Sequence, residues 1–140
     1  MRIHLTPKQL RHWRELHPTL YAVMEDVLLF WPVESLYITS IGRTIQQDRD
    51  LGASGIHSAG PPWRAIDIGI RNLGAHDYQE IADSLARKVN ARWQYDPTRL
   101  HLNVIVSKKH GTGAHIHGQV GALTERKGID ENGNGDNNVV

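Results

Sequence analysis

The feature that most constrains this chain is a strict two-residue alternation between residues 64 and 70. One set of alternating residues is Ile66, Ile68 and Ile70, and the other is Ala65, Asp67 and Gly69. Successive side chains of a β-strand point to opposite faces, so this period predicts a strand with one buried face. Asp67 then lies on a face that is otherwise kept small, where a carboxylate has no obvious packing role.

A second short segment, residues 114–120, repeats this period with histidine. His115 and His117 share one face of the predicted strand. If the two strands are neighbours, His57, Asp67 and His117 can converge as two histidines and one carboxylate, a ligand type that binds catalytic zinc and leaves a position open for water. His115 would then stand beside that water. On spacing alone, histidines with a purely structural role fit the pattern equally well.

Three stretches predict helices. Thr6-Pro7-Lys8-Gln9 predicts a capping box and a helix that runs to about Leu16. The three-and-four spacing of apolar residues predicts a second helix from Pro18 to Trp31, and a third begins at Asp77 as its cap and carries its apolar stripe to Trp93. The stripe of the second helix is interpreted as core: Leu20, Val23, Met24, Val27, Leu28 and Trp31.

The remaining alternating segments predict further strands. Residues 36–41 form one, and residues 100–107 form another that a turn joins to the His115 strand as a hairpin. In the latter strand, the side chains expected to face inward are Leu100, Leu102, Val104 and Val106. His101 is expected at the surface. The order of elements predicts an α+β fold, with a small, mainly antiparallel sheet that has helices packed on one face and a zinc cleft on the other.

Length and composition limit the number of domains, the possible metal ligands and the possible partners of the chain. The chain has 140 residues, which we assign to one domain over residues 1–129 and a polar, disordered tail over residues 130–140. It has no cysteine, so His, Asp or Glu must hold any metal. Sixteen basic and fifteen acidic residues leave a net charge of +1, which argues against a nucleic-acid partner.

The chain shows no sign of a membrane or export segment. No stretch approaches the roughly 18 apolar residues that span a bilayer, and the N-terminus lacks the pattern of a secretory signal. We therefore expect synthesis in the cytoplasm without a signal peptide, no membrane partner, and a monomer.

The residues around Asp67 resemble a known family. The segments that carry the resemblance are Ser40-Ile41-Gly42-Arg43, Ser54-Gly55-Ile56-His57 with Gly60, Ala65-Ile66-Asp67, and His115-Ile116-His117. Over about residues 36–120, their order resembles the zinc peptidases of the D-alanyl-D-alanine carboxypeptidase and L-alanyl-D-glutamate endopeptidase group, which share a fold with the Hedgehog signalling domain. One departure is the longer separation of His57 from Asp67, where Pro61, Pro62 and Trp63 look like an insertion.

The resemblance implies a role for each residue. It implies Zn²⁺ held by His57, Asp67 and His117, with His115 as the catalytic base and Arg43 as the residue that binds a substrate carboxylate. The implied substrate is a peptide of peptidoglycan, cut in the stem or crosslink. A phage lysin or a virion-associated hydrolase fits a lone domain of this kind, which would reach the cell wall through a phage holin or on a virion.

Two other classes stay open. The first is a non-catalytic, metal-binding structural or binding module of the same fold. The longer connection between His57 and Asp67 favours it, and the presence of His115 and Arg43 opposes it. The second is a metal-binding barrel of the cupin type, which requires many short strands and is opposed by the two long predicted helices.

Overall fold

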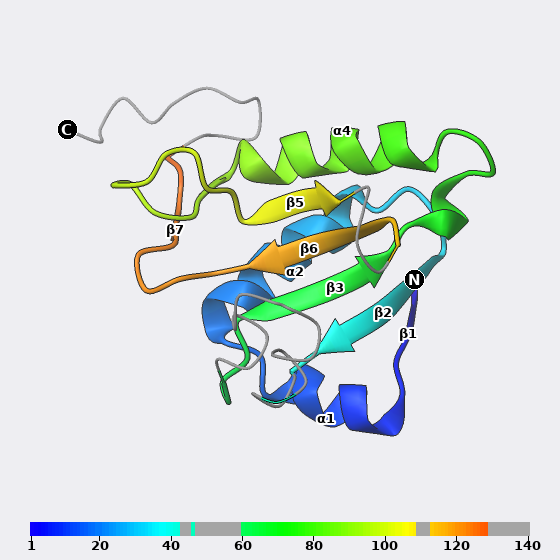
Figure 1. Cartoon of the computed structure of the whole chain (residues 1–140), viewed down its shortest axis with the longest axis horizontal. Coiled ribbons are helices and arrows are strands. Elements are labelled where there is room, and N and C mark those ends of the chain that lie inside the picture. Colours follow the sequence, from blue (N-terminus) through cyan, green and yellow to red (C-terminus); the bar gives the residue numbers. More distant parts are fainter. Residues whose placement is uncertain (43–45, 47–59, 109–112, 129–140) are drawn as a thin grey trace.

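The computed structural model describes residues 1–42, 46, 60–108 and 113–128 (Figure 1). Within these ranges the chain is a small α+β protein with three α-helices and a mixed sheet, so the predicted fold class is confirmed at this level. Two of the predicted site residues, Arg43 and His57, lie outside the described residues, and so does the predicted tail over residues 130–140.

A five-stranded sheet forms the centre of the fold, in the order β1-β2-β3-β6-β5. Its strands are β1 (Arg2–His4), β2 (Ser35–Ile41), β3 (Ala65–Gly69), β6 (His115–Gln119) and β5 (Ile105–Lys108). β1 and β2 run parallel, and the other neighbouring pairs are antiparallel. β3 and β6 are therefore neighbours, which is the condition for Asp67 to meet His117.

Three helices flank the sheet: α1 (Pro7–Arg14), α2 (Pro18–Phe30) and α4 (Tyr78–Asn90). Figure 1 shows α2 behind β3 and β6, α4 along the β5 edge, and α1 beside the end of β2. The predicted capping box of α1 is present, because Thr6 Oγ1 accepts the Gln9 N–H at 3.1 Å and Gln9 Oε1 accepts the Thr6 N–H at 2.8 Å. Asp77 is the N-cap residue of α4, as predicted, but its side chain makes no capping hydrogen bond.

The apolar core lies between the sheet and α2. Ile66 and Ile68 of β3 and Ile116 of β6 are fully buried, and burying each such side chain stabilises the fold by roughly 1.5–3 kcal/mol. The buried apolar residues of α2 are Leu20, Val23, Met24 and Val27. Because strand residues alternate between faces, Asp67 and His117 project from the face opposite to the core.

The strand predicted over residues 100–107 was wrong in its first half. Only residues 105–108 form a strand, and Leu100 is 74% exposed. The faces within β5 are also reversed from the prediction. Ile105 is the buried residue at 1% exposed, whereas Val106 is only partly buried and lies directly opposite His117.

A side-chain turn explains why the strand begins late. Asp96 Oδ1 accepts hydrogen bonds from the Thr98 hydroxyl at 2.6 Å and the Thr98 N–H at 2.8 Å, and its Oδ2 accepts the Arg99 Nε–H at 2.9 Å. These bonds, led by the one from the Thr98 hydroxyl, hold the pKa of Asp96 below its usual value. Asp side chains that bond the nearby backbone in this way stabilise turns in competition with strands.

Smaller elements complete the described part of the chain. A 3₁₀ turn, η2 (Arg71–Leu73), follows β3, and β4 (Trp93–Gln94) pairs with β7 (Glu125–Arg126) in a separate two-stranded sheet. Sequence patterns predicted a turn after β3 but not β1, β4 or β7, because each of these strands is only two or three residues long. Across the described ranges, every helix is too short or too polar to cross a membrane.

Candidate functional site

Asp67 and His117 form a buried pair on neighbouring strands. They are directly opposite in the antiparallel register of β3 and β6, and His117 Nδ1 lies 2.9 Å from Asp67 Oδ1. Asp67 is 5% exposed and His117 is 6% exposed. A polar pair so well shielded from water interacts strongly, because the surrounding dielectric constant is low. The predicted convergence of these two residues is therefore present in the structure.

His115 lies on the same face, two residues before His117. Its Nε2 is 3.8 Å from Asp67 Oδ1, and its Nδ1 is 2.7 Å from the carbonyl oxygen of Gly113. A carbonyl only accepts hydrogen bonds, so Nδ1 must carry a proton, and the neutral ring keeps its lone pair at Nε2. Gly113 has a φ of +115°, a backbone conformation that favours glycine.

Gln119 is a fourth polar residue on this face, and the sequence interpretation missed it. Gln119 Oε1 lies 3.0 Å from His117 Nε2, and Gln119 Nε2 donates to the carbonyl oxygen of Asn103 at 3.0 Å. The signal was present, because the period of two that joins His115 to His117 continues to Gln119.

Asp67 and His117 match zinc in ligand type. Zinc bonds of about 2.0–2.2 Å in a tetrahedron place ligand atoms about 3.3–3.6 Å apart. The observed 2.9 Å between Nδ1 and Oδ1 is a hydrogen-bond distance, so the two atoms would have to separate slightly to hold a zinc ion. In the part of the chain that the structure describes, no group of three or more histidine or acidic side chains is arranged to hold a metal ion. A complete centre thus needs a further ligand, for which the sequence prediction names His57, outside the described residues.

The residues interpreted as an insertion are attached to the N-terminal helices. The Trp63 N–H donates to the Glu15 carbonyl at 3.0 Å, and the Trp63 carbonyl accepts the His17 N–H at 2.8 Å. The Trp63 ring also packs on Gly42, where a Cβ atom would lie only 2.8 Å from it and where φ is +64°. Pro61 and Pro62 are exposed. These hydrogen bonds therefore attach Trp63, just before β3, to the segment that connects α1 and α2.

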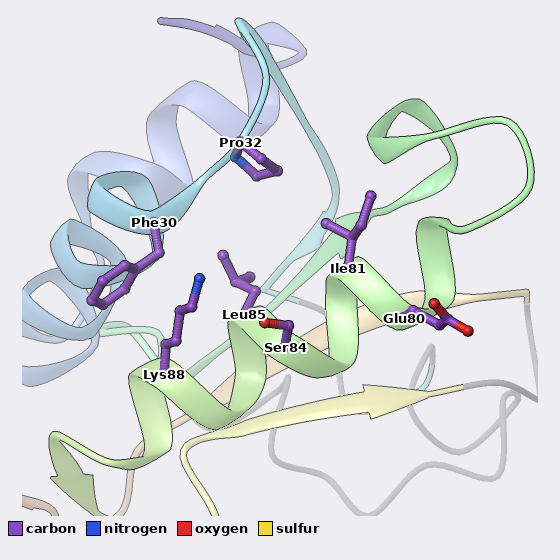
Figure 2. A pocket seen from close by; sticks show the side chains of 7 residues that line it. All are labelled: Phe30, Pro32, Glu80, Ile81, Ser84, Leu85 and Lys88. Carbon is purple, nitrogen blue, oxygen red and sulfur yellow. The ribbon is translucent and has the colours of Figure 1, made fainter.

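A separate hollow of about 310 Å³ lies between the end of α2 and α4. Figure 2 shows Phe30 and Pro32 on one side of it and α4 side chains, among them Ile81 and Lys88, on the other. These elements cover the helical side of the sheet, whereas Asp67 and His117 project from the other side. The hollow is therefore not part of the histidine cluster.

Comparisons of the chain with protein-family models, with curated proteins and with solved structures yield no match. The functional argument therefore depends on the residues and geometry of the cluster formed by Asp67, His115, His117 and Gln119.

Proposed function

We propose that the chain is a zinc-dependent peptidase that hydrolyses an amide bond in the stem peptide or crosslink of peptidoglycan. The observation that supports this proposal most is the buried Asp67–His117 pair, with His115 Nε2 only 3.8 Å from the same carboxylate oxygen. A carboxylate and two histidines on one sheet face are among the groups that metal-assisted amide hydrolysis uses, as two metal ligands and a general base. The wider fold that this implies is the Hedgehog-type peptidase fold.

Asp67, His117 and, from the sequence resemblance, His57 would hold the metal. Zinc in such a site polarises a scissile carbonyl and lowers the pKa of bound water to about 7. The carboxylate of Asp67 offsets positive charge in a site shielded from solvent. Since the isoleucines on either side of Asp67 are buried in the core, the backbone that carries this carboxylate is held rigidly.

In its neutral form, His115 has the orientation that a general base needs. Its Nδ1–H is fixed on the Gly113 carbonyl, which leaves the Nε2 lone pair on the side of Asp67. In the proposed reaction, Nε2 takes a proton from the attacking water and then delivers it to the leaving amine. The hydrogen bond to Gly113 keeps the ring oriented through both transfers.

Arg43 completes the proposed site on the strength of the resemblance alone. A permanently charged, planar guanidinium suits a free carboxylate of the substrate peptide. The biological setting proposed for this activity is wall degradation by a phage lysin or a virion-associated hydrolase.

Mass spectrometry of the fragments released from purified peptidoglycan tests this function. One arm contains zinc and the other a chelator, and several wall chemotypes are used as substrate. We expect soluble peptide fragments only in the zinc arm, and their masses identify the bond cut. If no chemotype releases fragments in either arm, the peptidase proposal is wrong and the non-catalytic module of the same fold replaces it.

A further inference from the structure

The orientation of the Gln119 amide is determined by the chain around it. Its backbone N–H donates to the Val104 carbonyl at 2.8 Å, and its side-chain Nε2 donates to the adjacent Asn103 carbonyl at 3.0 Å. Rotating the amide by half a turn would place Oε1 against the Asn103 carbonyl, which also only accepts hydrogen bonds. The oxygen of Gln119 must therefore face His117.

This orientation decides where His117 carries its proton. Gln119 Oε1, 3.0 Å away, accepts a hydrogen bond, so the proton must be on His117 Nε2. The other nitrogen, Nδ1, lies 2.9 Å from Asp67 Oδ1, and in the neutral ring it carries a lone pair directed at that oxygen. A lone pair and a carboxylate oxygen repel one another at this distance unless a proton or a metal ion lies between them.

We propose that Gln119 is a positioning residue, which holds His117 in the Nε2–H form and so presents Nδ1 to a divalent metal beside Asp67. The inference deepens the proposed function and depends on it. Metal-binding histidines commonly donate their second ring N–H to an oxygen acceptor, and removing that acceptor lowers metal affinity about 10–100-fold. Here the acceptor is an amide oxygen that the Asn103 carbonyl holds in place.

The first test measures zinc affinity by competition with a chromophoric chelator. We expect Gln119→Leu to weaken zinc binding about 10–100-fold, because it removes the acceptor and preserves much of the side-chain volume. Gln119→Glu restores an acceptor and should recover most of the loss. The matched control is Gln79→Leu, which removes an amide that bonds Asp83 and Ser107 on the helical side of the sheet and should leave zinc affinity unchanged.

The second test determines which ring nitrogen of His117 carries the proton, and it needs no variant. Two-bond ¹H–¹⁵N NMR of the histidine rings in the zinc-loaded wild-type protein should show His117 protonated at Nε2 and metal-bound at Nδ1. A ring bound through Nε2, or equal zinc affinity for Gln119→Leu and wild type, would overturn the role of Gln119. A wild-type protein that binds no zinc would overturn the proposed function itself, so the two failures are distinguishable.

Discussion

The two histidines of β6, which are separated by Ile116, have different partners. His115 bonds a backbone carbonyl through Nδ1, and His117 lies between Asp67 and Gln119. With one proton on each neutral ring, the lone pair is therefore on Nε2 in His115 and on Nδ1 in His117. In the proposed mechanism this difference suits His115 to act as a base and His117 to bind metal, because a base needs a lone pair near the substrate and a ligand needs one toward the metal.

His115→Ala tests the role of the base. We expect the variant to keep its zinc and to lose about 10²–10⁴-fold in turnover of the peptide substrate, the usual contribution of a general base. The measurement pairs metal content with the rate of fragment release. The control is His101→Ala, which alters an exposed histidine in a turn. Normal turnover in His115→Ala would remove His115 from the catalytic role.

We expect the protonation of His17 to make the unfolding free energy depend on pH, independently of the candidate site. It caps α2, because its Nδ1 accepts the Thr19 N–H at 3.2 Å. Burial, and then the positive charge of Arg64, lower the pKa of His17. The folded chain thus favours the neutral ring, while the unfolded chain binds a proton near pH 6.5. The stabilisation is complete above that pH and is lost as the pH falls through the lowered pKa of the folded state.

The variant His17→Asn keeps a helix cap but removes its protonation, since asparagine caps helices without binding a proton. Between about pH 8 and pH 5, we expect the wild type to lose up to about 1 kcal/mol more of its unfolding free energy than this variant, the usual value of a cap. Urea unfolding at both pH values measures the difference, with His101→Asn as the control. An identical pH dependence in wild type and His17→Asn would contradict the capping account.

At the scale of secondary-structure elements, the pairing of β3 with β6 brings the residues of the site together. A shift of one residue between these strands would move Asp67 or His117 to the other face, because side chains alternate with a period of two. The buried isoleucines at 66, 68 and 116 prevent that shift, since it would expose them to water. On the other side of β3, an irregularity between Ile38 and Ser40 places Ser40 opposite Asp67. The core thus determines the register on which the cluster depends.

Asp26 joins α2 to the small β4–β7 sheet. It is 6% exposed, and its carboxylate accepts the Trp93 Nε1–H at 2.8 Å and pairs with Arg92 at 3.3 Å and Arg126 at 3.4 Å. Asp26→Ala should lower the unfolding free energy by about 1–3 kcal/mol, because it leaves the buried indole N–H without an acceptor. Urea unfolding measures this effect.

Glu25→Ala is the matched control, since Glu25 is the exposed neighbour of Asp26 on the same helix. Its effect should stay within about 0.5 kcal/mol. Equal stability losses in the two variants would show that the Asp26 network contributes nothing specific.

Short sequence patterns correctly predicted the elements that depend on residues close together in the sequence. The isoleucine period predicted β3 and its buried face, and the Thr6–Gln9 capping box predicted the start of α1. Residues 100–103 were predicted wrongly, because the Asp96 turn overrides their apolar alternation. Asp26 resembles any polar residue of a helix surface, and its burial depends on Trp93 and Arg126, which are distant in the sequence. The proton positions of His117 likewise depend on the Asn103 carbonyl.

At the scale of the whole molecule, the two faces of the sheet have different compositions. One face, packed against α2, is apolar and is built mainly from isoleucine. The other carries Asp67, His115, His117 and Gln119. Because the chemical groups are attached to strands whose opposite faces are buried, they are positioned by the core itself, as a preorganised site requires.

The central claim is that Asp67 and His117 hold zinc, and metal analysis of purified protein tests it most directly. After incubation with zinc and exhaustive dialysis, elemental mass spectrometry gives the zinc content of the wild type, Asp67→Ala, His117→Ala and the control His101→Ala. We predict one zinc ion per chain in the wild type and the control, and none in the other two variants. A wild type without zinc, or a His117→Ala variant that retains it, would contradict the account.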